Sequence, residues 1–403
     1  MTKTSLFDYI IVGAGAAGLM LADAMGRDAF FADKSILLVD KDAKRNNDRT
    51  WCFWENGEGR FDAIVHKKWN HIYFGGQNFS KRFNITPYVY KMIKGVDFYT
   101  DYLERITAYP NIEFRQETVQ DIDDTLGKIM MTTDKGQYVA KKAFNSLFNY
   151  GMATFQNRYP VLQQHFLGWF VKTKKPVFKT DEVTYMDFSI PQKGNTRFMY
   201  VLPFSETEAL VEYTLFSEQT LHQLEYEKAI EHYLNTNLNC TEFEILEKEK
   251  GSIPMTCYDF KGYHTKNMRF IGTAGGWAKP STGYTFMSTA KKTPVLLEHI
   301  KTGKSLQKLN FKNRFWQYDL LFLDVLKRDN GKGHVIFEKL FKNRKPQLVF
   351  KFLDEETNFL EELYYMWGSP KIPFTKALWK RVLLRFYMAV RNPRQALTIL
   401  FCA

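Results

Sequence analysis

Hydrophobic and polar positions follow different patterns in successive parts of the chain. An apolar run at residues 9–12 enters a glycine-rich turn and a stretch of helical spacing, and a second apolar run follows at residues 36–39. From about residue 70 to 260, short β-rich runs alternate with turns, interrupted by a helical stretch at residues 221–234, which predicts an antiparallel sheet. Beyond residue 300 the pattern is mostly helical.

The turn after the first apolar run carries a glycine fingerprint. Three glycines stand there in the pattern G-x-G-x-x-G, and the second apolar run ends in an aspartate at about the expected distance. Such glycines permit a tight turn, close approach of a pyrophosphate and close helix–strand packing, and the acid accepts a ribose hydroxyl. The pattern therefore predicts a dinucleotide site formed by Gly13, Ala14, Gly15, Ala16, Ala17, Gly18, Asp40 and Lys41.

Composition and charge narrow the class of protein. The 403 residues are 45% hydrophobic and 25% charged, as in an ordinary folded protein with room for two domains or for one large domain with an insertion. Aromatic residues reach 16%, which suggests a large apolar cavity or an apolar outer surface. The net charge of +12 favours anionic partners, and we expect a membrane surface and no nucleic acid, because zinc-finger and RNA-binding motifs are missing from the sequence.

The sequence also bears on compartment and metal chemistry. The four cysteines form no C-x-x-C pair and the eight histidines have no metal-ligand spacing, so we expect neither a disulfide framework nor a metal site. The start of the chain leaves no room for a signal peptide, and no uncharged apolar run approaches the roughly 18 to 20 residues of a membrane span. We expect a cytoplasmic protein associated peripherally with the inner face of the cell membrane.

A second glycine-rich block at residues 270–284 follows the β-rich region. A nucleotide-type start, a middle sheet and a return to glycines predict an α/β fold with a discontinuous domain. We predict a Rossmann-type FAD-binding domain over residues 1–75 and 262–300. An inserted, mainly antiparallel β-sheet domain for the substrate, with helical segments, would cover residues 76–261. Residues 301–403 would form a helical C-terminal region that contacts the membrane.

Three further motifs occur in chain order: Asp48-Arg49-Thr50-Trp51-Cys52-Phe53, then Leu210-Val211-Glu212-Tyr213-Thr214, then Ala274-Gly275 with Pro280-Ser281-Thr282-Gly283-Tyr284. Together with the glycine fingerprint, they resemble the FAD-dependent lycopene cyclases of carotenoid synthesis, bacterial type, over about residues 5–300. One departure is Tyr213, which stands where the family's element has a second acid. Another is Thr273, which stands where hydroxylase-type flavoproteins usually carry an aspartate.

The resemblance implies a lycopene beta-cyclase. Its substrate would be lycopene or a related acyclic carotenoid, converted to γ-carotene and β-carotene. An acid protonates the terminal double bond, the resulting carbocation closes a six-membered ring, and loss of a proton completes a redox-neutral reaction. The resemblance also implies FAD in its reduced form, with NAD(P)H as the reductant. Whether the ring is β or ε, and whether one or two rings form, stays open, and we choose the β ring because the bacterial branch mostly makes it.

The resemblance also assigns roles to residues. Glu212 would be the catalytic acid, and in a strand it shares one face with Leu210 and Phe216, whose apolar surroundings would raise its pKa. Whether Glu212 or the flavin delivers the proton stays open. The flavin contacts would be Arg49, Trp51, Gly275, Thr282 and Gly283, the last two through backbone N–H groups directed at the isoalloxazine ring. Aromatic faces for the cation would come from Trp51, Trp277 and Tyr284.

Two segments near the C-terminus have their own interpretations. Residues 375–390 have apolar positions at helical spacing with interleaved Lys and Arg, which fits an interfacial helix or equally a core helix with a basic outer face. The similar pattern at residues 311–326 is interpreted as core. The run Phe352-Leu353-Asp354-Glu355-Glu356-Thr357 is superficially similar to the family's acidic element in plant relatives but lies after residues 280–284, so we expect a structural role. Its surroundings look helical, and Glu355, Glu356, Glu361 and Glu362 are expected on a solvated face.

Two alternative functions stay open. A flavin-dependent monooxygenase or other oxidoreductase acting on an apolar substrate would share the fingerprint. Such enzymes often carry a central Asp-Gly element, which the comparable residues 144–151 do not contain. A non-catalytic flavin-binding membrane protein is the third interpretation.

Overall fold

The first sheet is built around the parallel strands β1 (Ser5–Val12) and β2 (Ile36–Asp40), joined by helix α1 (Ala16–Arg27). The computed structural model describes residues 5–391. The two ends of the domains expected from the sequence, residues 1–4 and 392–403, lie outside the described residues. Strand order is β8-β2-β1-β11-β10-β9, with β17 beside β11. The other strands are β8 (Ile112–Gln116), β9 (Val119–Thr125), β10 (Lys128–Thr133), β11 (Gln137–Asn145) and β17 (Met268–Phe270).

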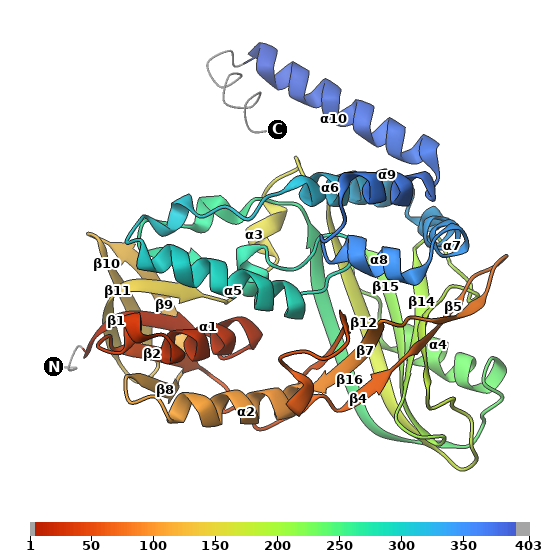
Figure 1. The fold of residues 1–403 in the computed structure, drawn as a ribbon, viewed down its shortest axis with the longest axis horizontal. Coiled ribbons are helices and arrows are strands. Elements are labelled where there is room, and N and C mark those ends of the chain that lie inside the picture. Colours follow the sequence, from red (N-terminus) through yellow and green to blue (C-terminus); the bar gives the residue numbers. More distant parts are fainter. Residues whose placement is uncertain (1–4, 392–403) are drawn as a thin grey trace.

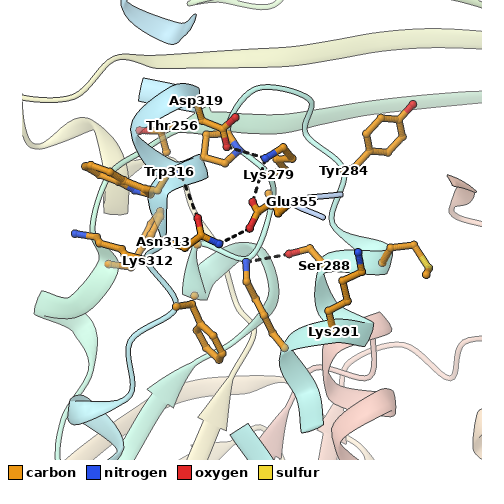
Figure 2. A pocket seen from close by; sticks show the side chains of 18 of the residues that line it. Thr256, Lys279, Tyr284, Ser288, Lys291, Lys312, Asn313, Trp316, Asp319 and Glu355 are labelled. Atoms are coloured by element: carbon orange, nitrogen blue, oxygen red, sulfur yellow. Dashed lines mark hydrogen bonds and ion pairs between the residues drawn. The ribbon is translucent and has the colours of Figure 1, made fainter. Parts of the chain in front are cut away.

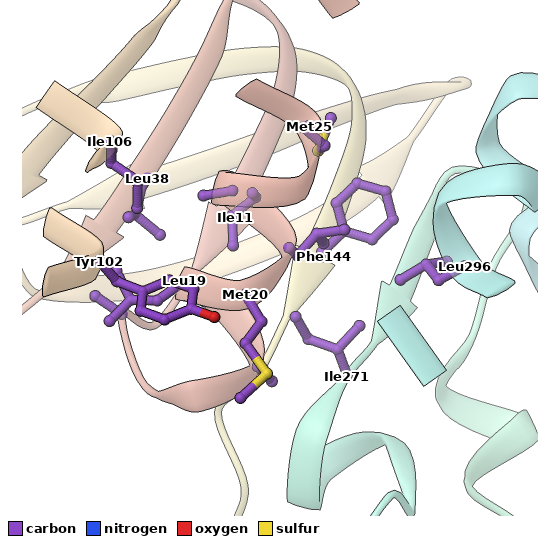
Figure 3. Close-up of a cluster of buried hydrophobic side chains, with 14 of the residues drawn as sticks. Ile11, Leu19, Met20, Met25, Leu38, Tyr102, Ile106, Phe144, Ile271 and Leu296 are labelled. Atoms are coloured by element: carbon purple, nitrogen blue, oxygen red, sulfur yellow. The ribbon is translucent and has the colours of Figure 1, made fainter. Parts of the chain in front are cut away.

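Helices cover the first sheet and close its core. Helix α1 packs against α2 (Gly95–Thr107) and against α5 (Phe286–Lys301), which comes from much later in the chain. Figure 3 shows the buried apolar side chains that meet there. Because Leu19 and Met20 of α1 share this core with Ile271 and Leu296, the late segment is held against α1.

The second sheet has the order β16-β12-β15-β14-β13-β5-β6 and is antiparallel except for the β5–β13 pair. Its strands are β5 (His71–Gly75), β6 (Lys81–Asn84), β12 (Val161–Thr173), β13 (Glu182–Asp187), β14 (Arg197–Pro203), β15 (Glu208–Ser217) and β16 (Phe243–Thr256). Helix α4 (Gln223–Thr236) packs on one face of it, and C-terminal helices cover the other (Figure 1). A small sheet, β3 (Thr50–Asn56), β7 (Tyr88–Lys94) and β4 (Lys67–Trp69), joins the two parts, and α3 (Gly151–Thr154) precedes β12.

The sheet pairing differs from the domain boundaries expected from the sequence. Residues 95–145 were expected in the inserted sheet, but β8 pairs in parallel with β2 and β11 with β1, so they complete the first sheet. Residues 71–75 were expected in the nucleotide domain and instead form β5 of the second sheet. Alternating β-rich runs look the same in either sheet, because only long-range pairing decides which sheet a strand joins.

The C-terminal region is helical, as predicted. Its helices are α6 (Arg314–Arg328), α7 (Gly333–Asn343), α8 (Pro346–Leu353), α9 (Phe359–Trp367) and α10 (Lys371–Arg391). The apolar side of α6 is buried, which confirms the interpretation of residues 311–326 as core. Helix α10 lies on the outside of the molecule (Figure 1) and begins before Thr375, because Pro373 fits in the first turn of a helix. None of the helices in residues 5–391 is long and apolar enough to cross a membrane.

Candidate active site

The glycine turn has the geometry that its sequence predicts. Gly13 has φ +93° and donates its N–H to the carbonyl of Val39 at 2.7 Å. A side chain at Gly18 would lie 1.9 Å from the carbonyl oxygen of Gly13, so close packing of helix on turn requires glycine there. Gly15 precedes the first turn of α1, and a Cβ on it would meet nothing within 4 Å. The first and third glycines therefore shape the turn, while the second leaves its outer side open.

Asp40 lies beside the turn. Its Oδ2 accepts a hydrogen bond of 2.6 Å from the N–H of Ala14, and its Oδ1 accepts one from Asp42. Lys44 approaches the same carboxylate at 3.5 Å and lines the adjacent cavity. Lys41, which the sequence suggested as a contact to the dinucleotide, is exposed and does not line this cavity. Lys44 lines the cavity instead.

A cavity of about 610 Å³ begins at this turn and forms the candidate site. Gly15, Ala16 and Ala17 line one end, and no side chain among the described residues caps the N-terminus of α1. Free N–H groups at a helix start attract phosphate, and the missing Cβ of Gly15 leaves room for it. These residues therefore fit the pyrophosphate of a dinucleotide. Arg49 and Trp51 line the cavity next to them.

The second glycine-rich block forms a turn beside the cavity, but not as expected. The N–H groups of Thr282 and Gly283 both donate to the carbonyl of Lys279, at 3.2 and 2.8 Å. They are used within the turn, so the expectation that they are directed at a flavin ring is wrong. A Cβ at Gly275 would lie 2.3 Å from the carbonyl oxygen of Phe270, so this glycine serves the turn as well.

The structure separates the three aromatic residues proposed to face a cation. Trp51 lines the cavity and stacks on Phe286, with ring centroids 5.1 Å apart. Tyr284 also lines it, and its hydroxyl lies 3.3 Å from that of Tyr90. Trp277 is fully buried in the core of the first sheet and is not among the cavity residues, so the structure does not bring it to the site.

Glu212 lines the cavity and has a partner carboxyl group. Strand β12 runs between β15 and β16, and its Gly168 is opposite both Glu212 of β15 and Glu249 of β16. The two glutamate side chains interact, and each affects the pKa of the other. A Cβ on Gly168 would lie 3.5 Å from Cβ of Glu212 and 3.2 Å from Cγ of Glu249. The glycine therefore leaves the space in which the two acids meet.

The surroundings favour the neutral form of this carboxyl pair. Burial, with the negative charge of the partner, raises the pKa of Glu212, and burial also raises the pKa of Glu249. Hydroxyl groups oppose the shift on each side: Thr214 donates to Glu212, and Thr50 donates to Glu249 at 2.7 Å. Because two adjacent carboxylates repel in a buried site, the pair retains protons above the ordinary range of a glutamate.

The strand faces explain the burial. Leu210 and Phe216 line the cavity with Glu212, whereas Val211 and Tyr213 pack under α4, so β15 alternates as its sequence predicts. Tyr213 replaced the second acid of the motif, and its side chain lies on the other face. The second carboxyl group beside Glu212 comes from a different strand, β16.

The other end of the cavity is apolar and reaches the C-terminal helices. Its lining there includes Phe322, Ile336, Phe337, Leu340, Phe341, Val349, Phe352, Leu353, Phe374 and Leu378. The last two lie on α10, where Trp379 and Leu383 are 66% and 64% exposed. Exposed apolar side chains continue on α9, among them Leu360 and Trp367. The apolar end of the cavity therefore lies beside the most apolar exposed surface of these helices.

The acidic run at residues 352–357 lies at a second cavity, of about 560 Å³ (Figure 2). There Lys279 pairs with Asp319 at 3.1 Å and with Glu355 at 3.0 Å. The run holds the C-terminal region against residues 279–284, consistent with a structural role. The expected solvated face is wrong for Glu362, which is fully buried and bonded to Arg314, because these acids neutralise lysine and arginine inside the fold.

Glu249, Gly168 and Lys44 were missed by the sequence analysis. Glu249 stands in the alternating run Glu247-Lys248-Glu249-Lys250, which looks like a solvated strand. A glycine inside a β-rich run was an available signal, because it often marks close approach of other groups. In the described residues, no group of three or more His, Cys, Asp or Glu side chains is placed to hold a metal ion.

Comparison with known proteins identifies the family. A family model described as lycopene cyclase protein matches residues 8–379. The chain belongs to the lycopene cyclase family. A lycopene beta-cyclase of Paracoccus sp. is 28% identical over 230 residues, which are 53% of this chain and 58% of that protein. The matched part thus spans little more than half of that relative.

Solved structures agree with the fold. A geranylgeranyl bacteriochlorophyll reductase-like protein of Thermoplasma acidophilum matches with a TM-score of 0.60 at 10% identity, covering 93% of this chain and 99% of that one. A flavoprotein/dehydrogenase of Cytophaga hutchinsonii matches with a TM-score of 0.57 at 13% identity, covering 90% and 99%. A p-nitrophenol 4-monooxygenase of Pseudomonas putida has a TM-score of 0.53 at 12% identity, covering 94% and 98%. The mixed α/β architecture is therefore that of a Rossmann-type flavoprotein.

Proposed function

We propose that this chain is a lycopene beta-cyclase that converts the acyclic ends of lycopene to β-ionone rings, giving γ-carotene and β-carotene. The observation that carries the proposal is a pair of adjacent carboxyl groups that line a cavity reaching from the glycine turn to apolar residues of the C-terminal helices. Family membership over residues 8–379 supports the substrate class. The reaction is an isomerisation without net electron transfer.

Glu212 supplies the acid in this proposal. Its carboxyl group transfers a proton to the terminal double bond; the O–H bond breaks, a C–H bond forms, and a tertiary carbocation remains. The neighbouring double bond attacks the cation and closes the six-membered ring, and loss of a ring proton restores neutrality. Leu210 and Phe216 beside the acid exclude water, which would otherwise trap the cation. Trp51 and Tyr284 present aromatic faces to the same cavity, and each face can contribute about 0.5 to 2 kcal/mol to a desolvated cation.

FAD is the proposed cofactor, held at the glycine turn by Gly13, Gly15, Gly18 and Asp40, with Lys44 as a further contact. Arg49, Trp51 and the turn at Thr282 and Gly283 lie along the same cavity. Reduced FAD, formed with NAD(P)H as reductant, would supply negative charge that favours a nearby cation.

The protein meets its substrate at a membrane surface in this proposal. Helices α9 and α10 expose aromatic and aliphatic side chains, and Lys371 lies 3.5 Å from the ring centroid of Trp367. Apolar residues with adjacent cations suit the boundary between headgroups and acyl chains. Since Phe374 and Leu378 also line the cavity, a carotenoid has a short route from the bilayer. We place the protein at the inner face of the cell membrane.

Expression in lycopene-accumulating cells tests the proposal. Wild-type protein should convert lycopene to cyclic carotenes, and Glu212→Gln should reduce cyclisation by about 100-fold or more, in line with loss of a general acid. Unchanged lycopene with folded, flavin-loaded wild type would refute the cyclase function. Because one similar structure is a monooxygenase, aerobic NADPH consumption should also be measured, and substrate-stimulated oxidation would favour the oxidoreductase.

A further inference from the structure

We propose that Glu249 is a positioning residue for Glu212: its carboxylate, set two strands away across Gly168, keeps the acid protonated until the substrate accepts the proton. This inference rests on the proposed function. In the transfer, the O–H bond of Glu212 breaks and its proton moves to the substrate carbon, while Glu249 stays ionised. The negative charge of Glu249 disfavours earlier loss of the Glu212 proton, because two adjacent carboxylates repel each other.

The strand register places the pair. Tyr200, Glu212, Gly168 and Glu249 occupy one row across β14, β15, β12 and β16. Directly opposed residues on neighbouring strands point to the same face. Adjacent strands are about 4.8 Å apart, so two strands separated by a third leave about 10 Å between the backbones of the two glutamates. Two glutamate side chains can span that gap only over a residue without a side chain, and Gly168 is that residue.

Glu249 is also anchored from outside the sheet. Thr50 of β3 donates to its Oε2 at 2.7 Å. Thr50 adjoins Trp51 in the same motif and lines the same cavity. Glu249 of β16 therefore connects the motif around residue 50 with the motif around residue 212, although it belongs to neither motif.

The other titratable groups near the two glutamates do not exchange protons near neutral pH. On β3, burial keeps the Cys52 thiol neutral by raising its pKa, and the side chain of Arg49, just before β3, is largely exposed. On β14, burial holds the pKa of the Tyr200 hydroxyl well above 10, so it also stays neutral. On β16, the exposed Glu247 adds a negative charge near Glu249 that opposes the charge of Arg49. The carboxyl pair is thus the group here that exchanges protons near neutrality.

The pH profile of cyclisation by the flavin-loaded enzyme tests the role. Ionised Glu249 raises the pKa of Glu212, so Glu249→Gln removes that charge but keeps an amide donor. Activity requires protonated Glu212, so the alkaline limb of the profile should move to lower pH by about one unit or more. This corresponds to about tenfold less activity on the alkaline side, with the acid-side plateau largely kept. Glu244→Gln, an exposed position on the same strand, is the matched control and should leave the profile unchanged.

A second variant and a second measurement guard against misfolding. Gly168→Ala places a Cβ 2.8 Å from Cδ1 of Leu210 and 3.2 Å from Cγ of Glu249, so both side chains must move. It should shift the limb in the same direction, whereas Gly262→Ala, at an open position, should not. Infrared absorption of protonated carboxyl groups should show two coupled proton losses in wild type and one in Glu249→Gln. An unchanged profile in a folded Glu249→Gln enzyme overturns the inference while the cyclase function stands. A wild type without cyclase activity overturns the function, and the infrared titration then still reports on the pair.

Discussion

The indole Nε1 of Trp54 donates a hydrogen bond of 2.8 Å to Oδ2 of Asp354, a residue 300 positions later in the chain. The bond ties β3, which carries the motif around residue 50, to the C-terminal helices. Trp54 also stacks on Phe350, with ring centroids 4.6 Å apart, so the contact combines a polar bond with packing. Both residues line the second cavity, so the contact fixes β3 to a segment that lies outside the recognised motifs.

Asp354→Ala should destabilise the protein because it leaves a buried indole N–H without an acceptor. We expect a loss of about 1 to 3 kcal/mol in the free energy of unfolding, measured by urea denaturation. Asp354→Asn keeps an acceptor oxygen and should lose less. Equal losses in the two variants would show that the hydrogen bond does not matter.

Gly15→Ala and Gly18→Ala should separate cofactor binding from folding. Alanine at position 15 meets no protein atom within 4 Å, so stability should stay unchanged while FAD affinity falls by about tenfold or more through steric conflict with the phosphates. Alanine at position 18 would collide with the turn and should destabilise the fold itself. Flavin fluorescence titration and thermal unfolding measure the two effects, and full FAD affinity in the Gly15 variant would contradict the proposed site.

The carboxyl pair should make stability fall with rising pH. Folded Glu212 and Glu249 have pKa values raised above the 4.5 of ordinary glutamates, so the folded state holds protons that the unfolded state releases. Their contribution is fully present below pH 4.5 and is lost as the pH rises through the raised values. Urea unfolding at a series of pH values should show this slope in wild type and a flatter dependence in Glu212→Gln/Glu249→Gln. Parallel curves would show that the pair is not shifted.

Charges on the outer face of α10 should weaken membrane binding without unfolding the protein. Trp379 and Leu383 are largely exposed, so Trp379→Lys/Leu383→Lys removes little buried area. Sedimentation with anionic phospholipid vesicles should fall several-fold, since the apolar anchor is lost. Leu126→Lys, at a 99% exposed site in the turn between β9 and β10, is the matched control and should bind as wild type does. Equal binding by both variants would place the membrane contact elsewhere.

Local sequence was sufficient for much of the site. The G-x-G-x-x-G turn, the alternation that buries Glu212 and the helical end all depend on residues close together in the chain, because turn geometry and periodicity are local properties. The hydrogen bond between Asp40 and the glycine turn belongs to the same local unit.

Only the tertiary structure decided the rest. Glu249 becomes a partner of Glu212 because β12 pairs with two strands at once and presents Gly168 between them, a relation absent from any local pattern. The position of Trp277 also depends on long-range packing, which buries this side chain in the core of the first sheet and away from the cavity. The sequence by itself determined which acid is buried on its strand. The fold determined its partner, because strand pairing brings together residues that no local spacing connects.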